Sequence, residues 1–91
     1  MDLTQVRAHI DRLDKALICL LAERQHWVEE AGRLKPRNDA AAVAAPERVA
    51  QVIATRREQA TQVGLSPEVA ESVWRAMIAA FIALEEDVNR T

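Results

Sequence analysis

The sequence contains few of the residues that small proteins use for turns, strands and covalent cross-links. Its 91 residues include two glycines, three prolines and one cysteine, and aromatic residues make up only 3%. A disulfide within the chain is excluded because Cys19 is the only cysteine, and we expect it to be a buried thiol in a reducing compartment. The scarcity of turn and strand formers argues against β architectures and predicts an all-α fold.

The sequence also lacks an excess of charge of one sign and a long hydrophobic run. Twelve basic against fourteen acidic residues give a formal charge of −2, so no global field attracts nucleic acid or an anionic membrane. Any anion site must therefore be local. The polar N-terminus has no apolar run long enough for a signal peptide or a membrane span. We expect one cytoplasmic domain over residues 1–91.

The dominant feature of the sequence is one long amphipathic helix, predicted from about Leu3 to Lys35. Pro36 ends it because proline cannot continue a helix and pushes the preceding residue toward extended geometry. Arg24 interrupts the apolar stripe of this helix, and Lys35 closes it. A cation in an apolar seam needs an anion, which could be a substrate. The stripe steps by three and four residues and consists of Leu3, Val6, Ile10, Leu13, Leu17, Leu20, Trp27, Ala31 and Leu34.

Two further helices are predicted after a linker of small residues at positions 37–45. One begins with Pro46 at its first position and ends at Gly64. The next begins at Ser66 and Pro67. Its stripe consists of Trp74, Ile78, Phe81 and Val88, with Glu85 where an apolar side chain is due.

The length of the first helix predicts a partner chain. About 32 residues span roughly 48 Å, whereas a compact chain of this length has a diameter of roughly 30 Å. The helix therefore overhangs its own fold with an apolar stripe along its whole length. We expect a two-fold homodimer in which the long helices run antiparallel, with the axis near residue 18 or 19.

Four cations converge in such a dimer. Arg24 and Lys35 are eleven residues apart, almost three turns, so they lie on one side of the helix with roughly 16 Å of rise between them. Arg7 is too far away within one helix, but the antiparallel arrangement places it between Arg24 and Lys35 of the other chain. Arg48 lies in the first turn of the second helix. Because guanidinium groups bind carboxylates in bidentate fashion, this cluster suits a compact dicarboxylate.

Two carboxylates, Glu47 and Glu85, are placed to face the cluster. Glu85 is either neutral among apolar residues, and then donates a hydrogen bond, or ionised against an arginine of the other chain. The cations also allow a simpler interpretation. Arg7 and Arg24 could form interchain salt bridges that only set the register of a non-catalytic dimerisation module.

The motifs of other chemistries are missing. His9 and His26 have no acidic or cysteine partner at ligand spacing, so we expect no metal site. The sequence has no Ser-His-Asp arrangement, no glycine-rich phosphate loop and no Cys-x-x-Cys motif. Neither a covalent nucleophile nor a cofactor is expected.

Five motifs are moderately specific alone and strongly specific in their order and spacing. They are Arg7-x-x-Ile10-x-x-Leu13-Asp14, Leu20-Leu21-Ala22-Glu23-Arg24, Gly32-Arg33-Leu34-Lys35, Pro46-Glu47-Arg48 and the third-helix run that ends in Glu85. From Leu3 to about Val88 the chain resembles the small all-helical chorismate mutases and the related isochorismate pyruvate lyases. The resemblance implies an intertwined three-helix homodimer with two equivalent sites.

The resemblance also implies roles for these residues in converting chorismate to prephenate, a step of aromatic amino-acid biosynthesis. Lys35 and Glu85 would donate hydrogen bonds to the ether oxygen of the breaking bond, and Glu47 would accept one from the ring hydroxyl. The implied catalytic residues are Lys35, Glu85 and Arg24, and the implied substrate-binding residues are Arg7 of the other subunit, Arg48, Glu47 and Phe81. The rearrangement needs no metal.

Three positions depart from the common bacterial pattern of these mutases. Glu85 stands where most bacterial members have Gln and fungal members have Glu, Phe81 stands where a small polar residue is frequent, and Pro46 stands where many have Arg. The run from Ala45 to Val49 is more similar to the lyases, whose loop before it is shorter. Chorismate mutase is therefore the first expectation, and isochorismate pyruvate lyase, which forms salicylate, is the alternative.

Overall fold

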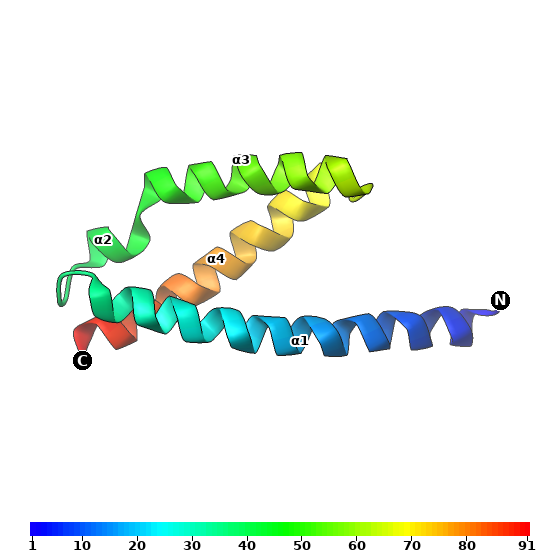
Figure 1. The fold of residues 1–91 in the computed structure, drawn as a ribbon, viewed down its shortest axis with the longest axis horizontal. Helices are drawn as coiled ribbons and strands as arrows, with labels where there is room; N and C mark the ends of the chain where they lie inside the picture. Colours follow the sequence, from blue (N-terminus) through cyan, green and yellow to red (C-terminus); the bar gives the residue numbers. More distant parts are fainter.

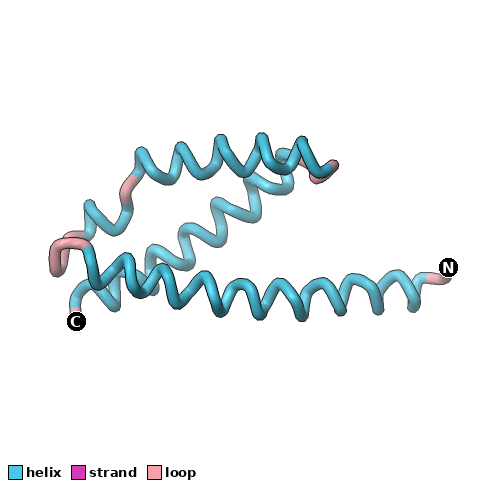
Figure 2. The backbone as a smooth tube through the Cα atoms, in the orientation of Figure 1, coloured by secondary structure: helices cyan, strands magenta, loops and turns pink.

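The structure, a computed structural model, describes residues 1–91 and is helical throughout, with short connecting loops (Figure 2). Its helices in chain order are α1 (Leu3–Leu34), α2 (Ala40–Ala44), α3 (Pro46–Val63) and α4 (Pro67–Arg90) (Figure 1). The all-α prediction and the three long helices are confirmed, with ends within about two residues of those expected. The prediction of a plain linker at positions 37–45 is wrong, because α2 lies inside it.

Local capping explains where these helices begin. Asp2 and Gln5 form a capping box at the start of α1, in which each side chain accepts a hydrogen bond from the other residue's amide. Asp39 caps the run of alanines and valine in α2 by accepting from the amide of Ala42 at 3.0 Å. The Ser66 side chain accepts from the Val69 amide at 3.3 Å and caps α4.

The ends of α1 and α3 follow the sequence signals. Lys35 takes an extended conformation before Pro36 and ends α1. Gly64 has a φ of 80°, in the left-handed region that favours glycine, and ends α3. Ala45 joins α2 to α3 with a φ of 39°. This strained backbone redirects the chain between the two helices.

Helix α4 is the centre of the fold, because α1, α2 and α3 all pack against it. Figure 1 shows α4 returning diagonally from the far end of α3 to the C-terminal end of α1. Helices α1 and α3 run in opposite directions on either side of it.

The core of the single chain is small. Only 8 of 91 residues are buried, and the radius of gyration is 15.8 Å, against about 12 Å for a compact chain of this length. The N-terminal half of α1 extends away from the other helices (Figure 1). The exposed large apolar side chains along this part of α1 and just beyond it are Leu3, Val6, Ile10, Leu13, Leu17, Ile18 and Leu20.

The overhang that the helix length predicts is thus present, while the homodimer stays a prediction. Cys19 was expected to be buried, but it is exposed because no other element covers this part of α1. None of the helices combines the length and the apolar character that crossing a membrane would require.

Candidate active site

A cavity of about 350 Å³ lies where α1, α3 and α4 face one another, with the end of α2 at its edge. Four cations and one carboxylate line it, namely Arg24, Lys35, Arg48, Arg56 and Glu85. Its apolar wall consists of Trp27, Val28, Ala31, Val43, Ala44, Ala45, Val49, Val52, Ile78, Phe81 and Ile82. The cavity therefore combines an apolar wall with a local excess of positive charge.

Lys35 and Glu85 form an ion pair in this cavity. The Lys35 ammonium donates to Oε2 of Glu85 at 2.7 Å, and the two side chains are 29% and 9% exposed. The contact matches the ionised interpretation of Glu85, although its partner is a lysine of the same chain rather than an arginine of another. Because a buried carboxylate is costly unless paired, each group fixes the position of the other.

Gly32 on α1 allows α4 to approach closely at Glu85. A Cβ atom at position 32 would lie 2.9 Å from Cγ of Glu85 and 3.3 Å from its carbonyl oxygen. Any larger residue would therefore force Glu85 or the α4 backbone to move. The glycine places the carboxylate of Glu85 within reach of Lys35.

Asn89, near the end of α4, holds the chain on both sides of Lys35. Its amide nitrogen donates to the carbonyl oxygens of Gly32 at 2.9 Å and Pro36 at 3.0 Å. Its side-chain oxygen accepts from the Asp39 amide at 2.7 Å. With 4% of its surface exposed, Asn89 satisfies backbone groups at the end of α1 and orients the turn that carries Lys35.

Arg24 is half-buried and lacks an acceptor. The guanidinium carbon lies 4.7 Å from the centroid of the Phe81 ring, and one terminal nitrogen, Nη1, is buried without any hydrogen-bond partner. Burial, and then the charge of Arg56, lower the pKa of Arg24 from its usual value. An unpaired buried donor on a desolvated cation favours binding of an anion.

Arg48 and Arg56 on α3 also lack carboxylate partners. Arg48 donates to Oε1 of Gln51 at 3.1 Å, and Arg56 donates to Oε1 of Gln59 at 3.2 Å. The guanidinium of Arg56 lies 5.7 Å from the centroid of Trp74. Together with Arg24, these residues give the cavity three guanidinium groups that no anionic side chain neutralises.

The structure brings together most of the residues predicted for the site. Arg24, Lys35, Arg48, Phe81 and Glu85 all line the cavity. Two others do not line it within the single chain. Arg7 lies on the exposed N-terminal half of α1, and Glu47 is exposed in the first turn of α3. The roles suggested for Arg7 and Glu47 stay predictions.

Sequence analysis missed Arg56, Asn89 and Gly32 as members or supports of the site. Arg56 had only a partial signal, because it lies four residues after buried Val52, but Arg57 lies four residues after buried Ile53 in the same way. Asn89 had none, since its partners lie more than fifty residues away in the sequence. The resulting arrangement can bind a small polyanion and present a fixed ammonium group to it.

The fold and the cavity define an all-helical protein with a cavity that is lined mainly by apolar side chains and cations. The model of the family described as "Chorismate mutase type II" matches residues 6–86. The chain belongs to this family, which confirms the resemblance found from its motifs.

Two T-proteins are among its relatives. The match to the T-protein of Enterobacter agglomerans is 38% identical over 86 residues and covers 94% of this chain and 23% of that protein. The match to the T-protein of Haemophilus influenzae is 36% identical over 73 residues and covers 80% of this chain and 19% of that protein. The chain thus spans less than a quarter of the length of either T-protein.

A third relative has a length closer to that of this chain. The isochorismate pyruvate lyase of Pseudomonas aeruginosa is 35% identical over 81 residues, and the match covers 89% of this chain and 78% of that protein.

Proposed function

We propose that this protein is a chorismate mutase that rearranges chorismate to prephenate without a covalent intermediate, a metal or a cofactor. The observation that carries the proposal is the grouping, in a member of this family, of three unpaired guanidinium groups beside the Lys35–Glu85 pair in one cavity. Chorismate is a small dicarboxylate with an apolar ring face, which suits both the charge and the wall of this cavity.

The proposed reaction needs a hydrogen-bond donor at the ether oxygen of the substrate. As the ether C–O bond breaks and a new C–C bond joins the enolpyruvyl methylene to the ring, negative charge develops on the ether oxygen. A donor fixed at that oxygen stabilises the transition state more than the substrate. Lys35 has three N–H groups and uses one for Glu85, so others can reach the ether oxygen. Holding the enolpyruvyl arm over the ring adds an orientation effect.

A second copy of the chain completes the site in this proposal. The exposed apolar stripe on α1 supports an intertwined antiparallel homodimer, since an unpartnered apolar helix face of this length is unfavourable in water. The dimer would bring Arg7 of one copy to the cavity of the other. Arg7 would then bind a substrate carboxylate together with Arg48, and Glu47 would bind the ring hydroxyl. The cytoplasmic location stays a prediction.

Isochorismate pyruvate lyase activity is the second candidate. It is favoured by the relative from Pseudomonas aeruginosa, 78% of whose length the match covers, and by the run from Ala45 to Val49. In that reaction the same ether C–O bond breaks while a ring hydrogen moves to the methylene carbon, which yields salicylate and pyruvate. A cation near the ether oxygen would serve either reaction.

One assay separates these activities. The purified protein is incubated separately with chorismate and with isochorismate, and prephenate, salicylate and pyruvate are quantified. Prephenate from chorismate is the expected result. Salicylate and pyruvate from isochorismate, without prephenate, would establish the lyase instead. If the protein converts neither compound, the interpretation as a non-catalytic dimerisation module is favoured.

Complementation between inactive variants tests the shared site. Arg7→Ala and Lys35→Ala should each lose activity, because every site contains the altered residue. In a mixed dimer, one site combines Lys35 of the first chain with Arg7 of the second and is intact. Random exchange of subunits should therefore restore about a quarter of wild-type activity. No recovery after exchange, verified by mass, would refute the transfer of Arg7 between chains.

A further inference from the structure

Arg56 is the cavity cation that has no role in the mechanism above. It lies two turns along α3 from Arg48, a rise of about 12 Å. Arg24 lies about 16 Å along α1 from Lys35. Because α1 and α3 run in opposite directions (Figure 1), Arg24 and Arg56 lie at the same end of the cavity, on facing helices. Lys35 and Arg48 lie at the other end.

Two aromatic rings on α4 hold these arginines. Arg24 lies over Phe81 at 4.7 Å, and Arg56 lies over Trp74 at 5.7 Å. Trp74 and Phe81 are two turns apart and therefore share one side of α4. A guanidinium over an aromatic face keeps its N–H groups free at its edge, where a planar carboxylate can accept two of them.

The two guanidinium groups line the same cavity, and no carboxylate pairs with either of them. Burial, and then the charge of Arg56, lower the pKa of Arg24, as expected for like charges in a partly desolvated site. Arg24 Nη1 has no acceptor, and Arg56 has only the neutral oxygen of Gln59. A bound carboxylate would relieve the repulsion and satisfy the buried donor.

We infer that Arg24 and Arg56 form a clamp for one carboxylate of the substrate, built from a single chain. The second carboxylate is then left to Arg48 and to Arg7 of the other copy. This assignment rests on the proposed function, because it divides the two carboxylates of that substrate between the two ends of the cavity. It makes Arg56 a substrate-binding residue.

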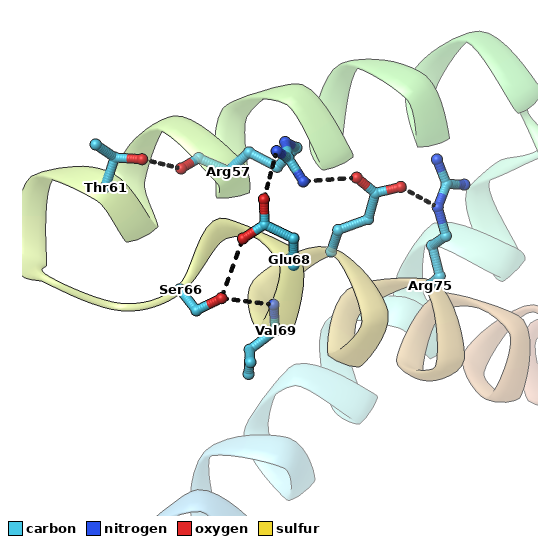
Figure 3. Close-up of polar contacts among 7 residues, drawn as sticks. Arg57, Thr61, Ser66, Glu68, Val69 and Arg75 are labelled. Carbon is cyan, nitrogen blue, oxygen red and sulfur yellow. Dashed lines mark hydrogen bonds and ion pairs between the residues drawn. The ribbon is translucent and has the colours of Figure 1, made fainter.

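The test compares Arg56→Gln and Arg56→Lys with the control variant Arg57→Gln. Arg57 is the next residue on α3, but it pairs with Glu71 at 3.0 Å and Glu68 at 3.6 Å outside the cavity (Figure 3). The measurements are KM and kcat for the active substrate, the affinity for isophthalate (benzene-1,3-dicarboxylate) by calorimetry, and the melting temperature.

The clamp predicts a KM raised about 10- to 100-fold by Arg56→Gln and isophthalate affinity reduced by a similar factor, as for loss of a charge-assisted hydrogen bond. Arg56→Lys should show a smaller loss than Arg56→Gln, since lysine keeps the positive charge but lacks the two parallel N–H donors of a guanidinium group. Arg57→Gln should lower the melting temperature and leave KM within about twofold.

Each other outcome decides the question. A folded Arg56→Gln variant with unchanged KM and isophthalate affinity overturns the clamp and leaves the proposed function standing. If Arg56→Gln does not fold, Arg56→Lys replaces it, and wild-type affinity in that variant overturns the clamp. A wild-type protein that turns over neither substrate, yet binds isophthalate through Arg56, overturns the proposed function alone. Absence of both turnover and binding overturns both.

Discussion

The Lys35 ammonium lies 2.7 Å from Oε2 of Glu85, and this contact joins the C-terminal end of α1 to α4. Glu85 is the only carboxylate among the side chains that line the cavity. It therefore holds one ammonium group in place while three guanidinium groups remain without an anion. In a pocket with this balance of charge, the carboxylate orients one cation, and the three guanidinium groups are available to bind an anionic ligand.

Replacement of Lys35 should abolish turnover and leave the fold intact. Loss of one fixed donor at a developing oxyanion typically lowers kcat by about 100- to 1,000-fold. We therefore expect Lys35→Ala to be nearly inactive, with the helical circular dichroism spectrum of the wild type. Lys15→Ala, at an exposed position of the same helix, is the matched control and should keep wild-type kcat. Comparable kcat in both variants would remove Lys35 from the mechanism.

Glu85 should affect the rate through Lys35. Its Oε2 atom accepts from the Lys35 ammonium at 2.7 Å, and this contact fixes the position of the ammonium group. Glu85→Ala removes the acceptor and should lower kcat more than it raises KM, because Lys35 loses its fixed position while the guanidinium groups stay. Glu85→Gln keeps an acceptor oxygen and should retain part of kcat. Wild-type kcat in Glu85→Ala would show that Glu85 does not position Lys35.

Arg24→Leu should separate stability from function. Burial lowers the pKa of Arg24, and its Nη1 atom has no partner, so replacing this desolvated cation with an apolar side chain should preserve or raise the melting temperature. Turnover should be lost because the anion loses its buried donor. Arg12→Leu, at an exposed position of α1, should leave turnover unchanged. Wild-type turnover in Arg24→Leu would favour the non-catalytic dimerisation module.

The parts of this fold that local chemistry determines were predictable from the sequence. Pro36, Gly64 and Ser66 each act within one turn of a helix, so the ends of the long helices followed from them. The presence of Arg24 and Lys35 in one cavity also followed, because both lie on one side of a helix with fixed rise and period.

Features that depend on contacts between distant segments were not predictable. Arg56 is indistinguishable in sequence from Arg57, which pairs with Glu71 outside the cavity. Only the direction in which α4 crosses α3 decides which of the two arginines lines the cavity. Asn89 near a chain end is ordinarily a solvated residue, and its burial depends on the turn after α1. The left-handed conformation of Ala45, with a φ of 39°, likewise has no local signal.

Asn89 should act as a positioning residue for Lys35. Its side chain makes three hydrogen bonds to backbone groups around the end of α1. Asn89→Ala leaves these buried groups unsatisfied and should lower the free energy of unfolding by about 1 to 3 kcal/mol. It should also lower kcat more than it raises KM, because Lys35 moves while the guanidinium groups stay. Asp87→Ala, at an exposed position of α4, is the control. A loss of stability with unchanged kcat would make Asn89 purely structural.

The hairpin of α3 and α4 should weaken in acid through Glu71. Its hydrogen bond with Arg75, and then the contact with Arg57, lower the pKa of Glu71 below its usual value of 4.5. Arg57 on α3 and Arg75 on α4 both donate to this carboxylate, and Figure 3 labels the two arginines on their helices. Because the pKa of Glu71 is lower in the folded state than in the unfolded state, ionised Glu71 stabilises the fold. This contribution is complete above the usual pKa and is lost as the pH falls through the lowered pKa.

The melting temperature of the wild type should therefore fall further between about pH 6 and pH 3 than that of Glu71→Gln. Glu58→Gln removes an exposed carboxylate of α3 that has no ion pair and should show the wild-type decrease. Equal decreases in wild type and Glu71→Gln would show that this ion-pair network does not stabilise the hairpin.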